Sequence, residues 1–366
     1  MEQIYRSKNL LVKAAHRGGV HCVVTFDPHA EDEQMKRLAF GEEFFDRHSI
    51  SVVHVLSRRN RWYHEADWRK AITAVKSAAS GYQRVITYGS SMGGYGALRF
   101  ASAIGAQLAL ALAPQYSVDP RKAPFETRWP RARRVRWLSE LSGPLSADVP
   151  AIIVYDSAMQ LERQHVDLIA GEMPIQRVAL PNSGHHIGAY LAECGLLGAF
   201  ALGAVNGELD LASLRQEARQ RRRRSPHRLM AISQKAFKRA PEAGILIARR
   251  AVDLAPNANF AWTNLGILLG RARRWQDAIK AHEKSVACDP RHSLAYIPLA
   301  IAFRESGDLP AALGALKTAE SLNGSLDRRL NIWMVRLGIL MRLTSATAIN
   351  PALKFRARVR KLLFLP

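Results

Sequence analysis

One short stretch in the first third of the chain constrains the fold more than any other. Residues 84–88 (Arg-Val-Ile-Thr-Tyr) are rich in β-branched and aromatic side chains, which is typical of a buried strand. From Met92 to Ala103, small and apolar residues recur at helical spacing. Residues 89–93, between the two, read Gly-Ser-Ser-Met-Gly. The sequence therefore predicts a strand, a very tight turn and a helix, with Ser91 at the turn.

The two glycines of this motif flank Ser91 at the places where the strand and helix backbones come closest. We expect the serine to take strained dihedral angles that hold its hydroxyl clear of the sheet. A serine hydroxyl is a weak nucleophile near neutral pH, so it requires a histidine base and an acid from elsewhere in the chain. The alternative is an ordinary glycine-rich turn, because this motif alone often arises by chance.

This stretch resembles the nucleophile elbow of the α/β-hydrolase superfamily. Residues 89–95, Gly-Ser-Ser-Met-Gly-Gly-Tyr, are similar to the elbow of bacterial serine esterases and related acyl hydrolases. The resemblance implies an α/β hydrolase fold over residues 1–207, with a mostly parallel sheet and helices on both faces. It also implies a serine hydrolase that cleaves an ester or other acyl bond through an acyl-enzyme. We expect no cofactor and no metal ion.

The remaining strands place the partners of Ser91. Apolar runs predict strands at the following residues: 9–14, 21–26, 51–56, 108–113, 150–155 and 175–180. Asp156 follows one of the last two strands, and His185 and His186 follow the other. The chain order is then serine, acid, histidine, as in the superfamily. Each candidate lies at the carboxyl end of a strand, where an open parallel sheet gathers its ligands.

Two of these assignments have rivals nearby. His185 is favoured over His186 as the base because it directly follows Gly184 in a polar, turn-rich loop. Asp156 is favoured over Glu162 as the acid because a short side chain at a strand end is better fixed. Asp156 has an alternative role as a turn or helix-cap residue.

The resemblance implies an oxyanion hole made of two backbone N–H groups. One belongs to Met92, the residue after the nucleophile. The other belongs to the loop after strand 21–26, and we place it at Asp27. As an alternative, Asp27 and His29 are plain turn residues.

Two arginine-rich stretches surround the predicted site. Residues 115–146 interrupt the β/α pattern and interleave arginines with Trp129 and Trp137. In α/β-hydrolases such an insertion forms a lid, and this one would suit an anionic substrate; the alternative is a solvated basic helix packed by its tryptophans. Residues 58–64 contain the pair Trp62-Tyr63, which either lines a substrate cleft or covers the edge of the core.

The second half of the chain repeats itself. Residues 251–256 (Ala-Val-Asp-Leu-Ala-Pro) and 285–290 (Ser-Val-Ala-Cys-Asp-Pro) are offset by 34 positions, 285 − 251. Trp262-x-x-Leu-Gly returns as Tyr296-x-x-Leu-Ala at the same offset. This pattern resembles the tetratricopeptide repeat, an all-α solenoid of antiparallel helix pairs.

The repeat resemblance implies units at 225–258, 259–292 and 293–326, with a capping helix at 328–343. The corresponding domain covers residues 229–345, and its implied role is protein–protein interaction. Residues 208–228 are assigned as a basic linker, and their dense basic run at 215–228 is expected to be either a linker or an exposed helix. The basic amphipathic tail, 346–366, either sits on an anionic membrane or packs on the end of the solenoid.

The net charge of +22 favours acidic partners such as an anionic lipid surface or polymer. No nucleic-acid motif accompanies the charge, so we do not expect nucleic-acid binding. Cys22, Cys194 and Cys288 are odd in number, widely spaced and without metal-ligand spacing, which fits a reducing, cytoplasmic location. The longest apolar run, residues 194–205, is far below the ~20 residues that span a bilayer, and the amino terminus lacks the pattern of a signal peptide.

A second hypothesis belongs to a different functional class. The hydrolase-like half would have lost its chemistry, and the protein would be an adaptor whose repeats bind a partner. The two hypotheses differ in whether Ser91 reacts.

Overall fold

The computed structural model describes residues 1–30, 35–322, 335–336 and 338. It divides the chain into two compact units, Met1–Ile232 and Ser233–Pro366. Each unit is described below by itself.

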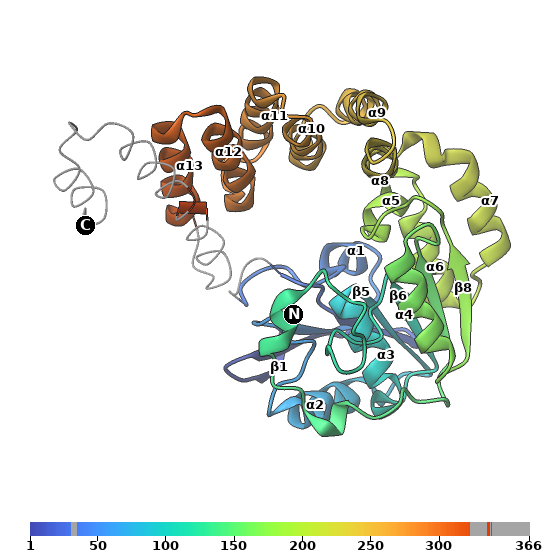
Figure 1. Cartoon of the computed structure of the whole chain (residues 1–366). Helices are drawn as coiled ribbons and strands as arrows, with labels where there is room; N and C mark the ends of the chain where they lie inside the picture. Colours follow the sequence, from blue (N-terminus) through green and yellow to red (C-terminus); the bar gives the residue numbers. More distant parts are fainter. Residues whose placement is uncertain (31–34, 323–334, 337, 339–366) are drawn as a thin grey trace. The chain divides into compact units, whose positions relative to one another are not determined.

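The first unit is built on an eight-stranded sheet in the order β1-β2-β4-β3-β5-β6-β7-β8 (Figure 1). The pairs β1–β2 and β2–β4 are antiparallel, and every other pair is parallel. The strands are β1 Glu2–Arg6, β2 Leu10–Ala15, β3 His21–Phe26, β4 Ser51–Ser57, β5 Arg84–Ser90, β6 Leu108–Leu112, β7 Ala151–Tyr155 and β8 Ile175–Ala179. The sequence patterns anticipated all of these except β1.

Parallel strands covered on both faces need apolar side chains at almost every position. Strand β7, Ala-Ile-Ile-Val-Tyr, follows this rule, and all the residues of β4 and β7 are buried. Neighbouring residues alternate between two separate cores: Val24 packs in one and Val23 in the other.

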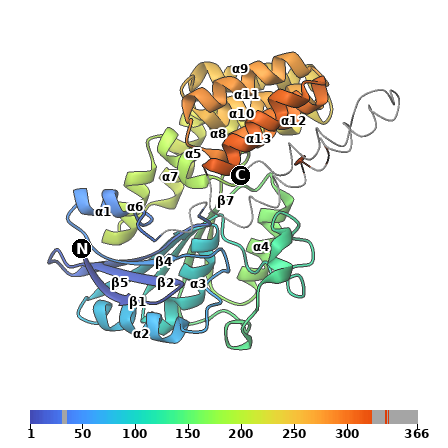
Figure 2. The ribbon, with the colours of Figure 1, turned by 90° about the vertical axis from the view of Figure 1, so that its left-hand side faces the viewer.

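Helices cover both faces of the sheet, as Figures 1 and 2 show. One core receives side chains from α2 (Trp68–Ala79), α3 (Met92–Ile104) and α4 (Gln160–Ala170). The other receives them from α1 (Glu42–Arg47), α5 (Ile187–Glu193), α6 (Leu197–Asn206) and α7 (Leu211–Arg221). The fold is therefore a mostly parallel sheet between two helical layers.

The segment 208–228 is not a linker: it contains the helix α7, as the alternative anticipated, but one face of that helix is buried. Asp210 accepts hydrogen bonds from the first backbone N–H groups of α7, and Leu214 and Ala218 are buried in the second core. A 3₁₀ turn, Arg222–Arg224, follows α7, and α8 begins at Pro226. The first unit consequently extends to Ile232, well past the predicted boundary at 207.

The insertion at 115–146 forms no α-helix, so the alternative of a solvated basic helix is wrong. It contains two 3₁₀ turns, η1 Pro130–Arg134 and η2 Ser139–Leu141, within irregular chain. Arg99 on α3 donates to the carbonyl oxygens of Gly143 and Pro144 and ties the end of the insertion to the sheet unit.

The second unit is a row of antiparallel helix pairs (Figure 1). The pattern of small and large buried residues keeps the 34-residue offset: Leu265 and Leu299 are buried, as are Ala278 and Ala312. This is a helical-repeat region that resembles the tetratricopeptide repeat. Its helices are α8 Pro226–Phe237, which begins in the first unit, α9 Pro241–Leu254, α10 Asn259–Arg271, α11 Trp275–Cys288, α12 Ser293–Ser306 and α13 Leu309–Ser321.

The predicted capping helix at 328–343 and the tail at 346–366 lie outside the described residues, apart from Val335, Arg336 and Gly338. Cys22, Cys194 and Cys288 all carry free thiols. Among the helices that the structure describes, none is by itself long and apolar enough to span a bilayer. The bent pair α5–α6, with 106° between its axes, satisfies the length and composition test only when joined.

Candidate active site

The turn between β5 and α3 is as tight as the sequence predicts. Ser91 has φ 54° and ψ −117°, a conformation that L-residues rarely adopt. A Cβ atom on Gly89 would lie 2.1 Å from the carbonyl oxygen of Gly93, and one on Gly93 would lie 2.1 Å from that of Phe26. Only glycine fits at both places, and the strain is concentrated on Ser91.

The Ser91 hydroxyl has two partners. His185 Nε2 lies 2.9 Å from Ser91 Oγ, and Gln115 Nε2 donates to the same oxygen at 3.0 Å. Ser91 is 7% exposed. The structure therefore brings together Ser91 and His185, which lie 94 positions apart in the chain.

His185 lies in the loop from β8 to α5. Two residues of this loop have positive φ, Asn182 at 62° and Gly184 at 77°, and the resulting bend carries the imidazole toward Ser91. His186 directly precedes α5, and its ring packs 5.7 Å from that of His227. Burial, together with the two neighbouring histidines, lowers the pKa of His186 to about 4, so this ring is neutral at pH 7.

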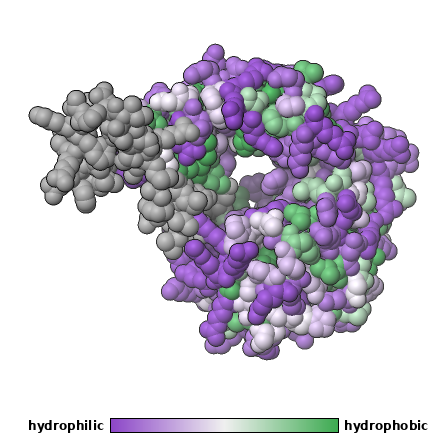
Figure 3. Space-filling model, in the orientation of Figure 1, coloured by the Kyte–Doolittle hydropathy of each residue, from purple (hydrophilic) through white to green (hydrophobic). Residues whose placement is uncertain are grey.

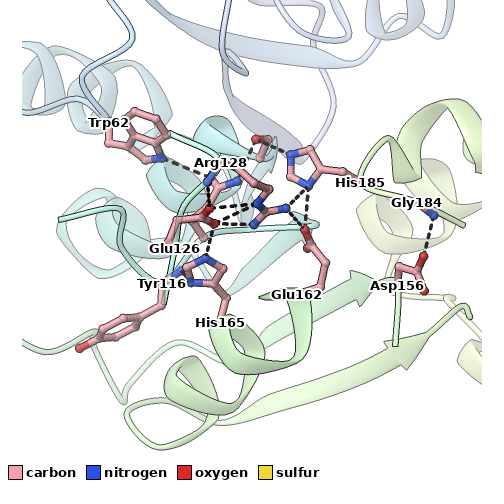
Figure 4. A network of polar contacts seen from close by, with 11 residues as sticks. Trp62, Tyr116, Glu126, Arg128, Asp156, Glu162, His165, Gly184 and His185 are labelled. Atoms are coloured by element: carbon pink, nitrogen blue, oxygen red, sulfur yellow. Dashed lines mark hydrogen bonds and ion pairs between the residues drawn. The ribbon is translucent and has the colours of Figure 1, made fainter. Parts of the chain in front are cut away.

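The carboxylate beside His185 is Glu162 and not Asp156. Glu162 lies in the first turn of α4, is fully buried, and places Oε1 2.9 Å from His185 Nδ1. Asp156 instead accepts backbone N–H groups at 2.8 Å from Ala158, Asn182 and Gly184. Figure 4 shows Asp156 on the backbone of Gly184, away from the imidazole.

Asp156 and Glu162 take each other's expected place because their side chains differ in length. The histidine loop bends back over the end of β7, so the short Asp156 side chain meets its backbone first. The longer Glu162 side chain enters from α4 and meets the ring. Asp156 thus holds the loop in which His185 lies, and the preference for Asp156 over Glu162 as the imidazole's partner is corrected.

Arg128, from the insertion, lies between two carboxylates (Figure 4). Its Nε and Nη2 pair with Glu126, and its Nη1 donates to Glu162 Oε1. The same Nη1 lies 3.4 Å from His185 Nδ1. A buried carboxylate needs such a partner, because an unpaired charge in the interior is very costly.

The charges in this cluster support one another. Burial alone would raise the pKa of Glu162, but the hydrogen bond from His185 and the charge of Arg128 leave that pKa below its usual value. Glu126 is also desolvated, yet hydrogen bonds from His165 and Arg128 bring its pKa down to about 2. Both carboxylates are therefore ionised at pH 7.

His165, at the outer end of the cluster, has a fixed tautomer. The backbone N–H of Tyr116 donates to Nδ1 of His165 at 3.2 Å, so that nitrogen is an acceptor. The proton of this buried histidine then lies on Nε2, which is 2.9 Å from Glu126 Oε2.

Gln115 is anchored by a tryptophan. Trp62 Nε1 donates to Gln115 Oε1 at 3.2 Å, and both side chains are almost fully buried. Trp62 and Tyr63 have φ of 49° and 60°, two consecutive residues in the left-handed region. Both aromatic rings belong to the first core, yet the indole N–H of Trp62 serves the polar site.

The two expected oxyanion donors differ. Met92 is the first residue of α3, and within the described part of the chain its N–H has no hydrogen-bond acceptor. The Asp27 N–H, in contrast, donates to the carbonyl oxygen of Val55 at 3.1 Å. The carboxylate of Asp27 is occupied by Arg37 and by the N–H of Phe40. Asp27 is therefore a structural residue, and its assignment to an oxyanion hole is wrong.

Sequence patterns gave Glu162 as a rival acid but no role for Gln115 or Arg128. The available signal for Gln115 was its position just beyond the carboxyl end of the apolar run 108–113. Among the residues that the structure describes, no group of three or more histidine, cysteine, aspartate or glutamate side chains is arranged to hold a metal ion.

No family model and no curated protein matches this chain. Parts of the chain are similar to solved structures. The TPR2B domain of yeast Sti1, in its pHsp70 complex, is 16% identical and covers 32% of this chain and 97% of its own (TM-score 0.30). YrrB, a TPR protein with an unusual peptide-binding site, is 17% identical over 42% of this chain and 76% of its own (TM-score 0.29).

A likeness of another kind is the capsule O-acetyltransferase of Neisseria meningitidis serogroup A, solved as a mutant in complex with CoA. It is 10% identical and covers 48% of this chain and 85% of its own, with a TM-score of 0.38.

Proposed function

We propose that the sheet unit is a serine hydrolase that cleaves an ester bond through an acyl-enzyme. The observation that carries this proposal is the continuous row of contacts from Ser91 Oγ to His185 Nε2 and from His185 Nδ1 to Glu162 Oε1, both at 2.9 Å. A serine, an imidazole and a carboxylate in this order form the arrangement that activates a hydroxyl for acyl transfer.

In the first half of the reaction, Ser91 Oγ bonds to the ester carbonyl carbon while His185 Nε2 takes the hydroxyl proton. The carbonyl π electrons move onto the oxygen, and the Met92 N–H donates to that oxyanion. Glu162 holds Nδ1–H and stabilises the imidazolium. When the tetrahedral intermediate collapses, the bond to the leaving oxygen breaks and His185 returns the proton to the departing alcohol.

In the second half, water attacks the acyl-enzyme. His185 takes one proton from the water, and the carbonyl oxygen again carries the negative charge. Collapse breaks the bond between Ser91 Oγ and the acyl carbon, releases the carboxylic acid and, as His185 gives its proton to Oγ, restores the serine hydroxyl.

Two features of the site support an enzymatic role. The strained dihedral angles of Ser91 hold its hydroxyl toward His185 at a cost of about 1–3 kcal/mol. Arg128 keeps the desolvated Glu162 ionised, and Asp156 fixes the loop of His185 through the backbone N–H groups of Asn182 and Gly184.

The insertion favours an acyl substrate that carries negative charge. Arg133, Arg134 and Arg136 are exposed on the same segment that supplies Gln115 and Arg128 to the site. We expect a succinyl ester to be hydrolysed with a lower KM than the acetyl ester of the same alcohol. Equal KM values at low and high salt would remove the electrostatic argument.

The test uses p-nitrophenyl acetate and butyrate with the full-length chain. Wild-type protein should release p-nitrophenol with saturation kinetics, and Ser91→Ala should reduce kcat by at least about 10³-fold. The neighbouring Ser90→Ala is the matched control and should retain activity. Equal rates for wild type and Ser91→Ala would refute the proposal.

For the helical-repeat unit we propose binding of a protein segment. Its surface in Figure 3 is mostly hydrophilic with apolar interruptions. Two adjoining depressions share Arg249, Trp262 and Leu265, and the exposed Leu246 borders one of them. The second candidate function, a non-catalytic adaptor, would keep this binding and lack ester hydrolysis.

Retention of a purified partner by the immobilised full chain separates the two candidates. Binding that survives Ser91→Ala but fails in Leu246→Glu would assign recognition to the repeats. Binding unaffected by Leu246→Glu would place recognition elsewhere. An adaptor alone would show such binding together with rates on p-nitrophenyl esters that equal those of Ser91→Ala.

A further inference from the structure

Three residues of the loop that was expected to supply the second oxyanion donor have no free backbone N–H. The Asp27 N–H is used by Val55, Pro28 has no N–H, and the Ala30 N–H donates to Asn60 Oδ1 at 2.9 Å. Asn60 also returns a hydrogen bond to the carbonyl oxygen of Ala30 and fixes the loop. Each preorganised donor aimed at the developing oxyanion adds to catalysis, so a second donor beside the Met92 N–H is of value.

Gln115 presents a donor at the right place. Its Nε2 lies 3.0 Å from Ser91 Oγ, the atom that bonds to the carbonyl carbon. The oxyanion forms on that same carbon, so it develops one bond farther along from Oγ. An amide nitrogen carries two hydrogens, and Gln115 has therefore one for Oγ and one for the oxyanion.

The orientation of this amide follows from its other partner. Trp62 Nε1 is a donor only, so the Gln115 atom that faces it must be the oxygen. The NH₂ group then necessarily faces Ser91. Without Trp62, a half-turn of the amide would put a carbonyl oxygen beside the developing negative charge.

The amide is held rigidly. Gln115 is 1% exposed and Trp62 is 2% exposed. The Trp62 ring packs edge-on against Trp129 and at a tilt against Trp137. The left-handed conformations of Trp62 and Tyr63 are strained, and they place the indole N–H on Gln115.

We infer that the Gln115 side-chain amide is the second donor of the oxyanion hole, with the Met92 N–H as the first and Trp62 as the residue that positions the amide. This inference rests on the proposed serine hydrolase function. A buried, neutral and preoriented donor stabilises the transition state without reorganisation, and losing one such donor costs about 10²–10³ in kcat.

Gln115→Glu keeps an acceptor for Trp62, but it replaces the NH₂ group by an oxygen that carries negative charge at pH 8. It is therefore paired with Gln115→Met, which removes the donor without adding a charge. At pH 8, we expect kcat of both variants for p-nitrophenyl acetate to fall by about 10²-fold or more with little change in KM. Affinity for a methyl trifluoromethyl ketone, which forms a tetrahedral adduct with the serine, should fall in parallel. Trp62→Phe should lower both quantities less, because the amide remains but is free to rotate.

Gln107→Ala is the matched control, since its amide is also anchored, to the N–H of Val85 and the carbonyl oxygen of Gly105, but away from Ser91. It should leave kcat and ketone affinity unchanged. If Gln115→Glu or Gln115→Met folds and keeps both quantities, Gln115 only supports Trp62 and the inference is overturned. If neither variant folds, Trp62→Phe with wild-type ketone affinity overturns it. A wild-type chain with no esterase activity and no ketone binding would instead refute the hydrolase proposal, and the inference would fall with it.

Discussion

The two units differ in what they bury. The helical-repeat unit is packed largely with alanine and leucine, and its few buried polar side chains include Asn264, which donates to Ser233. The sheet unit buries ionisable groups at one edge, among them Glu162, His165 and Asp27. Buried charges cost stability unless each has a partner, so a fold retains them where they serve a purpose.

The two units also differ in where residues with a strained backbone lie. In the described residues of the repeat unit, Arg273 is the sole non-glycine residue with positive φ, and it lies in the turn between two helices. In the sheet unit, Ser91, Trp62 and Ala113 have positive φ, and each lies on or next to a segment that forms the site. Most of the non-glycine residues with positive φ in the described part of the sheet unit therefore lie where that unit gathers polar groups.

Among the substitutions that test this contrast, Glu162→Gln should have the largest effect. The amide cannot hold His185 as a carboxylate does, so we expect kcat for p-nitrophenyl esters to fall by about 10³–10⁴-fold with little change in KM. Asp156→Asn is the comparison, because its role is to hold the loop. A greater loss in Asp156→Asn than in Glu162→Gln would restore Asp156 as the acid.

The substitution Gly244→Ala tests the packing of the repeat unit and should leave the sheet unit unchanged. A Cβ atom on Gly244 would lie 2.7 Å from the backbone Cα of Phe237, so Gly244→Ala forces α8 and α9 apart. We expect a loss of about 1–3 kcal/mol in the free energy of unfolding of the repeats, measured by urea denaturation, and unchanged ester hydrolysis.

The matched control for that change is Gly314→Ala. Gly314 is exposed on α13 and has no atom within 4 Å of its Cβ position. This substitution should stabilise the helix by about 0.5–1 kcal/mol. Equal destabilisation by both substitutions would show that close helix packing at Gly244 is not what matters.

Arg128→Gln should have a smaller effect than Glu162→Gln. Loss of the guanidinium removes one of the causes that lower the pKa of Glu162, so this carboxylate protonates at a higher pH. We expect the acid limb of the kcat/KM profile to move to higher pH. Activity at pH 7 should fall by about 10-fold, the effect of losing one charge-assisted hydrogen bond. An unshifted acid limb would mean that Arg128 only ties the insertion down.

The smallest effect concerns the pH dependence of stability. Glu126 has a pKa of about 2 in the folded protein against 4.5 for the unperturbed group. A depressed folded-state pKa contributes stability above pH 4.5 that is lost as the pH falls toward 2. Calorimetry should therefore show the largest difference in Tm between wild type and Glu126→Gln near pH 7, and the difference should shrink below pH 4.5. A constant difference down to pH 3 would contradict this.

The repeats could be predicted well because their information is local and periodic. Each unit of 34 residues has small and large residues at the same positions, so the offset alone marks Leu265 and Leu299 as core residues. The elbow was equally accessible, since a strand, two glycines and a helix lie within one short stretch around Ser91.

The acid could not be decided from spacing. Asp156 and Glu162 both follow β7, and the choice depends on the path of the histidine loop, which no pattern in the sequence specifies. Gln115 and Arg128 were inaccessible for a similar reason: their contacts depend on the irregular course of the insertion, without helical or strand periodicity. The basic run at 208–228 misled because its charges masked the apolar stripe of Leu211, Leu214 and Ala218.

The most direct test of the central claim is to label the full-length chain with a fluorophosphonate and map the adduct by peptide mass spectrometry. The structure predicts one modified residue, Ser91, with labelling lost in His185→Ala and strongly slowed in Glu162→Gln. Folded wild-type protein that stays unlabelled, or an adduct on a serine other than Ser91, would contradict the account.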